Sequence, residues 1–178
     1  MTIKMKKPLT AGAAVLLCAA ALLCGCGDKP SADTPANTSA AETAPAQTET
    51  ALTAAGIFEE LGKSGLCEEL DTTVLFGTDA FASACPKLYG TDPSALTDGG
   101  VMFVGAGTIA DEVSVLGGGE GLTELLKNRA DIRAGDFSGY APEEQTKAQN
   151  AIVFEHKGLS VLVISDRAEE IKKAIIAM

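Results

Sequence analysis

The hydrophobic positions along this chain of 178 residues fall into three regions with different patterns. Residues 11–23 form a nearly unbroken apolar run, and residues 27–51 contain almost only small and polar side chains. From Leu52 onward, short apolar segments with helical or alternating spacing are separated by glycine-rich turns. The pattern predicts one folded domain over 52–178, preceded by an apolar leader and a polar connecting segment.

Helical spacing predicts several helices in the folded region. Thr53 is a suitable N-cap for the first, because a threonine oxygen accepts hydrogen bonds from the free amide groups at a helix start, and the second is expected to begin at Thr78 or Asp79. A third helix is expected from about Glu120 into the 130s, and a fourth at Pro142, a residue favoured in a first turn. The last helix is expected to be capped by Asp166, where the sequence matches a capping box.

Strand patterns predict two hairpins. Residues 101–104 are apolar on both faces, and residues 112–116 alternate as an antiparallel partner would. The clearest hairpin is 151–165, where Gly158 supplies the left-handed backbone that a tight turn favours. A helix follows each hairpin. The expected fold class is therefore α+β, an antiparallel sheet built from two hairpin-plus-helix units with the helices packed on one face.

The N-terminal pattern is typical of an exported lipoprotein. Three lysines precede the apolar run of 11–23, which is too short to span a bilayer stably. The run ends in Leu23-Cys24-Gly25-Cys26, which resembles a lipobox because a small residue stands before the cysteine that receives the lipid. We expect cleavage after Gly25 and lipidation of Cys26. An ordinary signal peptide with incidental cysteines is the alternative.

These features predict where the protein acts. Two acyl chains hold a protein at a membrane almost permanently, so we expect it at the extracytoplasmic face of the cell membrane, bound through its N-terminal lipid. The polar segment lacks the apolar surface needed to offset its ordering entropy and is expected to be a disordered tether. The expected organisation is a signal peptide over 1–25, the lipidated cysteine and tether over 26–51, and a single domain over 52–178.

Charge and composition exclude some classes of function. The formal charge is −10, and loss of the three leader lysines leaves 11 basic against 24 acidic residues, a net −13 for the mature chain. Nucleic acid is therefore not an expected partner, because its binding needs a basic face. The chain has no tryptophan and only two tyrosines, which disfavours aromatic-lined sugar or peptide clefts.

The mature domain retains two cysteines, Cys67 and Cys85. A disulfide between them is chemically permitted outside the membrane. Two buried free thiols that behave as small hydrophobic side chains are the alternative, and the sequence leaves both open.

Candidate catalytic, metal and cofactor patterns are weak. Residues 105–110 match a dinucleotide fingerprint, but the following residues alternate like a strand where that fingerprint needs a helix. His156, the only histidine, falls at the predicted hairpin turn, where we expect it to be solvated, and no acidic pair near it has metal-ligand spacing. Adjacent acids such as Glu143 and Glu144 do not face each other on a helix. We expect no cofactor, no metal and no catalytic residues.

Motifs in the folded region resemble those of short bacterial lipoproteins, mostly from Gram-positive anaerobes, that carry "domain of unknown function 4358". The matching segments are residues 88–93 (Leu-Tyr-Gly-Thr-Asp-Pro), 110–113 (Ala-Asp-Glu-Val) and 140–143 (Tyr-Ala-Pro-Glu). Their order, with the final hairpin and helix, extends the resemblance over 55–178. The resemblance implies an envelope location and a domain shape, but no reaction.

Three hypotheses about function follow. The favoured one is a non-catalytic binding or accessory domain whose partner is an envelope protein or a small ligand, recognised by two loops. The second is an enzyme on envelope or extracellular substrates, which requires a pocket where at least two titratable groups converge. The third is a structural or assembly spacer, which requires an exposed apolar patch. The loop residues are Tyr89, Gly90, Asp92, Pro93, Gly105, Gly107 and Asp111.

Overall fold

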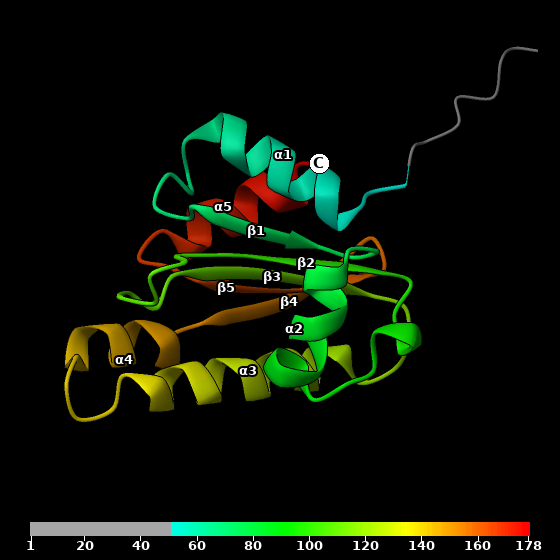
Figure 1. Ribbon diagram of the computed structural model, residues 1–178. Helices are drawn as coiled ribbons and strands as arrows, with labels where there is room; N and C mark the ends of the chain where they lie inside the picture. The colour runs from blue at the N-terminus through cyan, green and yellow to red at the C-terminus, as the bar shows by residue number, and fades with distance from the viewer. Residues whose placement is uncertain (1–50) are drawn as a thin grey trace, which may run out of the picture. The chain divides into compact units, whose positions relative to one another are not determined.

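The computed structural model describes residues 51–178, in which the apolar segments become strands and helices (Figure 1). The predicted signal peptide, Cys26 and nearly all of the tether lie outside these residues. No helix of the described part is long and apolar enough to cross a membrane. The elements in chain order are α1 (Ala54–Ser64), β1 (Thr72–Leu75), α2 (Asp79–Tyr89), the 3₁₀ turn η1 (Pro93–Ala95), β2 (Asp98–Phe103), β3 (Glu112–Gly117), α3 (Leu122–Asp136), α4 (Pro142–Gln149), β4 (Ile152–His156), β5 (Leu159–Ile164) and α5 (Ala168–Ile176).

The five strands form one antiparallel sheet in the order β1-β2-β3-β5-β4. The two predicted hairpins are β2–β3, followed by α3, and β4–β5, followed by α5. They meet at the centre of the sheet, where Val113 of β3 pairs with Val163 of β5. The α+β class and the two hairpin-plus-helix units are therefore confirmed.

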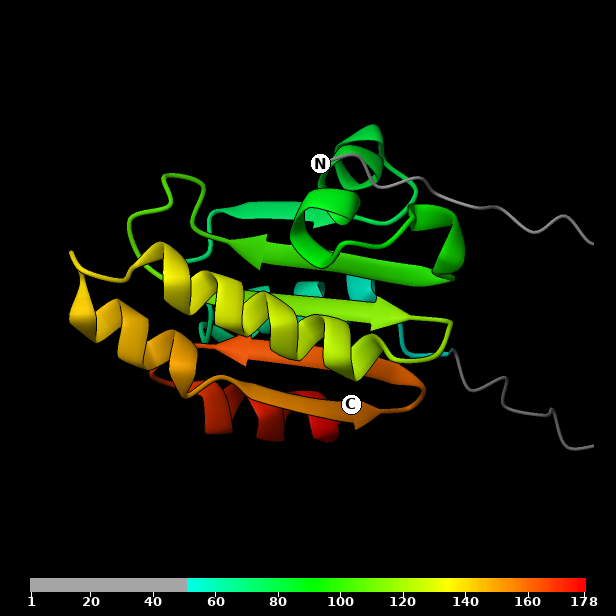
Figure 2. The ribbon, with the colours of Figure 1, turned by 90° about the horizontal axis from the view of Figure 1, so that it is seen from below.

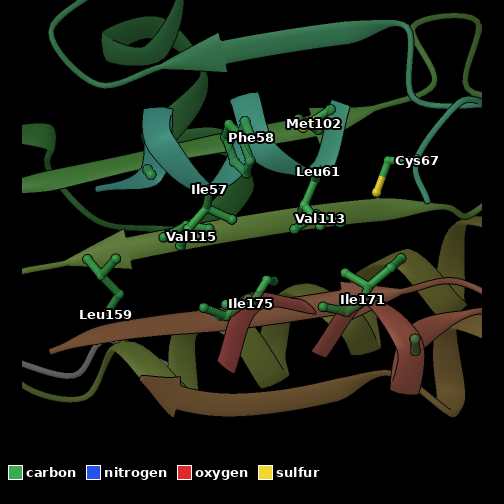
Figure 3. Close-up of a cluster of buried hydrophobic side chains, with 14 residues drawn as sticks. Ile57, Phe58, Leu61, Cys67, Met102, Val113, Val115, Leu159, Ile171 and Ile175 are labelled. Atoms are coloured by element: carbon green, nitrogen blue, oxygen red, sulfur yellow. The ribbon is translucent and has the colours of Figure 1, made fainter. Parts of the chain in front are cut away.

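The helices cover both faces of the sheet, so the prediction that they pack on one face was wrong. α1 and α5 lie on one side, and α2, α3 and α4 on the other (Figures 1 and 2). The reason lies in β3 and β5, which are buried at every position and need cover on both faces. Side chains alternate across a strand, so Val113 and Val115 pack toward α1 and α5 (Figure 3). Leu116 of the same strand belongs to the cluster beneath the opposite helices.

Local signals set most of the element ends. Thr53 caps α1 as predicted, and Thr78, one of the two predicted starts of α2, caps that helix. Each accepts a hydrogen bond from the amide group three residues later, at 3.1 and 3.2 Å. At the β4–β5 turn Lys157 and Gly158 have φ of 48° and 80°, the pair of positive values that a two-residue hairpin favours. The predicted capping box at Asp166 is absent, because α5 begins two residues later without a side-chain cap.

Candidate functional site

The sheet-facing side of α3 carries two arginines. Leu122, Leu126, Arg129 and Arg133 follow one another at spacings of four, three and four residues, which places them on one side of a helix. All four are buried, and each arginine keeps only 9% of its surface exposed. Buried charges need partners, so these guanidinium groups direct attention to what faces them.

Glu112, the first residue of β3, is the partner of Arg129. Its side chain is fully buried, and its two carboxylate oxygens accept hydrogen bonds from Nε of Arg129 at 3.0 and 3.1 Å and from Nη2 at 2.5 Å. Burial opposes the charge of Arg129, but the hydrogen bonds and the negative charge of Glu112 outweigh this and raise the pKa of Arg129. The pair is a charge-assisted, bidentate contact between sheet and helix.

A chain of hydroxyl groups extends this pair toward α2. The Tyr89 hydroxyl donates to Oγ of Ser114 at 2.8 Å, and the Ser114 hydroxyl donates to Oε1 of Glu112 at 2.7 Å. Burial, and next the charge of Glu112, raise the pKa of Tyr89 above its ordinary value, so its phenol stays protonated and acts as a donor. The network therefore runs from α2 through β3 to α3: Ser114 and Arg129 donate to the Glu112 carboxylate, and Tyr89 donates to Ser114.

A pocket of about 150 Å³ opens beside the Glu112–Arg129 pair. Glu112, Arg129 and Arg133 contribute to its wall, together with the exposed residues Gly105 and Gly107. It thus combines ionisable groups with a largely apolar wall, the combination that small-molecule sites usually show. The remaining lining consists of four apolar side chains: Leu88, Val101, Phe103 and Val104.

The β2–β3 loop, residues 104–111, forms one side of this pocket and is fastened at both ends. At the start, the Gly105 amide donates to a carboxylate oxygen of Asp71 at 2.7 Å. At the far end, Nη2 of Arg133 donates to the carbonyl of Ile109 at 2.6 Å, and the Ala110 amide donates to Glu144 of α4 at 2.6 Å. The residues between these anchors are exposed.

The structure brings few of the predicted recognition residues to the pocket. Gly105 and Gly107 line it. Asp111 is buried instead in an ion pair with Lys147 of α4, whose Nζ lies 2.6 Å from Oδ2. Tyr89 is also buried, with 5% exposed, and contributes through its hydroxyl rather than as a surface side chain. Tyr89 and Asp111 therefore lie inside the domain and do not present surface side chains to a partner.

The other residues of the predicted Tyr89–Pro93 turn have local structural roles. Gly90 ends α2 with a φ of 67°, a conformation that favours glycine. The Asp92 side chain accepts hydrogen bonds from the amide and the hydroxyl of Ser94, and Pro93 begins η1. These contacts shape the turn and leave it outside the pocket.

The sequence pattern did not predict the charged groups of the pocket, because Arg129 fits an amphipathic helix and Glu112 fits an alternating strand. A usable signal existed. Two arginines continue the spacing of Leu122 and Leu126 on α3, where leucines would otherwise be expected. Ile132 of the same helix, by contrast, is 52% exposed.

Cys67 and Cys85 are both free and both buried. Cys67 belongs to the cluster beneath α1 and α5 (Figure 3), and Cys85 to the cluster beneath the helices of the opposite face, so the sheet separates them. The structure thus shows two free thiols, the second of the two alternatives, and no disulfide between these two residues. Burial raises the pKa of the Cys67 thiol to about 11, which keeps it protonated and unreactive.

The remaining weak patterns also have definite positions. Residues 105–110 lead into β3, as the alternation predicted, and not into a helix. His156 ends β4 and is half-buried, with an enclosed Nε2 that has no hydrogen-bond partner, so its predicted solvation was wrong. Residues 51–178 contain no group of three or more His, Cys, Asp or Glu side chains placed to hold a metal ion.

Comparison with known proteins adds no relative: no family model, curated protein or solved structure matches the chain. The site is therefore interpreted from its own geometry. That geometry is a small pocket whose wall holds a buried carboxylate and two buried guanidinium groups on rigid elements.

Proposed function

We propose that this protein is a lipid-anchored lipoprotein of the cell envelope, related to those with domain of unknown function 4358, whose extracytoplasmic domain binds a small ligand without catalysis. The observation that carries the binding role is the pocket over the Glu112–Arg129 pair. Its polar groups are held on β3 and α3 before any ligand arrives, and such preorganisation lowers the entropic cost of binding.

The hydrogen bonds around the pocket support a non-catalytic role. Both oxygens of Glu112 already accept from Arg129, and Oε1 accepts from Ser114 as well. A general base needs a free lone pair within reach of substrate, and a serine nucleophile needs an accessible hydroxyl. Ser114 is fully buried and does not line the pocket. The pocket does meet the convergence of titratable groups that the enzyme hypothesis requires, but its one carboxylate, Glu112, is already occupied by Arg129 and Ser114.

The dimensions of the pocket favour a small molecule over a protein partner. A cavity of about 150 Å³ holds a molecule of roughly the size of benzene. Among the described residues, the large apolar side chains that remain exposed come from four different elements or loops, so no element presents an apolar stripe that suits the spacer hypothesis. These side chains are Phe76, Ile132, Tyr140 and Ile176.

The anchor is tested in cells with two matched substitutions, Cys26→Ser and Cys24→Ser. We expect the wild type and the Cys24→Ser variant to sediment with membranes, and the Cys26→Ser variant to be released or left unprocessed. Mass spectrometry of the mature wild type is expected to show a diacylated cysteine as its first residue. Membrane retention of a processed Cys26→Ser variant, or uncleaved wild type in the cytosol, would contradict the anchor.

The binding role is tested by filling the pocket. The mature chain carrying Cys26→Ser is titrated with a chemically mixed set of small probes, and binding is followed by amide NMR shifts. Leu88→Phe narrows the pocket, whereas Leu125→Phe enlarges another half-buried leucine packed on the same core cluster but outside the pocket. We expect at least one probe to bind saturably, and Leu88→Phe to weaken it about tenfold while Leu125→Phe does not. Absence of any probe sensitive to Leu88→Phe would overturn the binding role.

A further inference from the structure

We infer that the pocket binds a short-chain monocarboxylate, with its carboxylate toward Arg129 and Arg133 and its hydrocarbon chain against the apolar wall. This inference rests on the proposed binding function and deepens it by naming the ligand chemistry. Three independent features of the site support it: the balance of charge, the unused donors and the volume.

The charge balance of the pocket is positive although the chain is strongly acidic. Glu112 neutralises Arg129 through the bidentate contact. Arg133 donates mainly to the uncharged carbonyls of Ile109 and Ala110. Its nearest carboxylate is that of Asp136, 3.6 Å from Nη1, whose side chain is about half exposed and therefore well screened by solvent. One positive charge remains without a buried counterion, so an anion is favoured over a cation or a neutral molecule.

The unused donors of the two arginines match a carboxylate. Arg129 uses Nε and Nη2 for Glu112, and its Nη1 takes part in no hydrogen bond among residues 51–178. Arg133 uses Nε and Nη2 for the loop carbonyls, and its Nη1 has only the 3.6 Å contact with Asp136. The two residues stand one turn apart on the same side of α3, and both line the pocket. A carboxylate, with two acceptor oxygens, can accept from both.

The apolar wall and the volume set the length of the ligand. Leu88, Val101, Phe103 and Val104 offer hydrocarbon contact. A benzene-sized volume corresponds to about six non-hydrogen atoms, which is the size of a four-carbon carboxylate. An inorganic anion would leave the apolar wall unused, and a long-chain fatty acid would extend outside the pocket. A carboxylate of three to five carbons fits both the charge and the space.

The experiment compares four-carbon probes that differ in charge: butyrate, butanol and butylammonium. Each is titrated by amide NMR shifts into the mature chain carrying Cys26→Ser, at constant ionic strength, with inorganic phosphate and octanoate as further probes. We expect butyrate to bind at least about tenfold more tightly than butanol and butylammonium, since a hydrogen bond to a charged group contributes about this factor. We also expect it to bind more tightly than phosphate, which leaves the apolar wall unused, and octanoate, which extends outside the pocket. The comparison needs no pocket variant, so it does not depend on how well a variant folds.

Two variants of α3 then assign the charge recognition. Arg133→Gln removes the uncompensated charge and is expected to weaken butyrate about tenfold while leaving butanol unchanged. Lys127→Gln removes a charge from the exposed side of the same helix, where the side chain is 57% exposed, and is expected to change neither. The amide spectrum of each variant reports whether the fold is retained, and if Arg133→Gln does not fold, the wild-type probe series decides.

The outcomes separate this inference from the proposed function. If butanol or butylammonium binds as tightly as butyrate and is weakened by Leu88→Phe, the carboxylate specificity is overturned while the binding function of the pocket stands. Octanoate binding as tightly as butyrate would overturn the assigned chain length, and phosphate binding as tightly as butyrate would overturn the assigned contact between the hydrocarbon chain and the apolar wall. If no probe of any chemistry responds to Leu88→Phe, both the inference and the proposed function fail.

Discussion

Replacing Arg129 by methionine tests whether the buried ion pair is as isolated from solvent as its geometry indicates. The Glu112 side chain has no exposed surface and the Arg129 side chain keeps 11%, so removing the cation leaves a carboxylate in the core without a counterion. Breaking a buried pair in this way costs about 3–5 kcal/mol. For a domain of this size, 1 kcal/mol corresponds to about 4 °C, so we expect the melting temperature to fall by roughly 12–20 °C.

The assay is thermal and chemical unfolding, followed by circular dichroism, of four proteins compared with the wild type. They are R129M, E112M, the double variant E112M/R129M, and K127M as a surface control. Replacing both charges by apolar side chains of similar length leaves no unpaired charge in the core. The free energy of unfolding of the double variant is therefore expected to lie within about 2 kcal/mol of the wild-type value. K127M breaks an exposed pair with Glu124 and is expected to cost less than about 1 kcal/mol.

Two results of this double-mutant cycle would refute the reasoning. If the free energy of unfolding of R129M lies within about 1 kcal/mol of the wild-type value, water reaches Glu112 and the pair is not the buried contact described above. If the double variant is as unstable as the sum of the single variants, the two side chains do not interact energetically. Either result would remove the preorganised polar wall on which the proposed binding role depends.

Three further predictions follow from single contacts. Tyr89→Phe removes the hydroxyl that donates to Ser114 and is expected to cost about 1 kcal/mol in chemical unfolding, whereas Tyr140→Phe, at an exposed position, is expected to cost nothing measurable. Gly105→Ala would place a methyl group 2.5 Å from the Thr72 hydroxyl and is expected to cost about 1–3 kcal/mol, whereas an alanine in place of Gly62, in open space on α1, is expected to stabilise by up to about 1 kcal/mol. Both mature-domain thiols are expected to resist a thiol reagent until the chain unfolds. Burial raises the folded pKa of Cys67 to about 11, so the contribution of this protonated thiol to the free energy of unfolding is expected to be fully present below about pH 8.5 and to be lost as pH rises toward 11. Rapid labelling of the folded domain at pH 8 would contradict the burial of these thiols.

Local patterns along the chain were enough to predict most elements. Thr53 and Thr78 act within one turn of their own helices, and the Lys157–Gly158 turn acts within its own hairpin. Such signals need no knowledge of distant residues, and each of these predictions was confirmed. α2 shows the limit of local rules, because it continues through Pro86, a residue that disfavours a helix interior. Packing outweighs local preference there.

The layer arrangement and the site depended on contacts between distant segments. Whether a hairpin is covered on one face or two is decided by which strand pairs with β3, and the sequence does not state that β5 does so. Glu112 and Arg129 are separated by 17 residues and come from different elements, so neither alone distinguishes a surface charge from a buried one. The burial of every position of β3, including a carboxylate, is visible only once both helical layers are in place.

The two-ended fastening of the β2–β3 loop has a practical consequence. Ala106 and Thr108 lie between the anchors at Gly105 and Ile109, are exposed, and flank Gly107, which lines the pocket. Both native thiols of the domain are enclosed by the core, so a cysteine introduced at position 106 would be the single accessible attachment point on the mature domain once Cys26 is replaced. An environment-sensitive dye attached there would report ligand entry as a change in emission, while the rest of the fold remained unmodified.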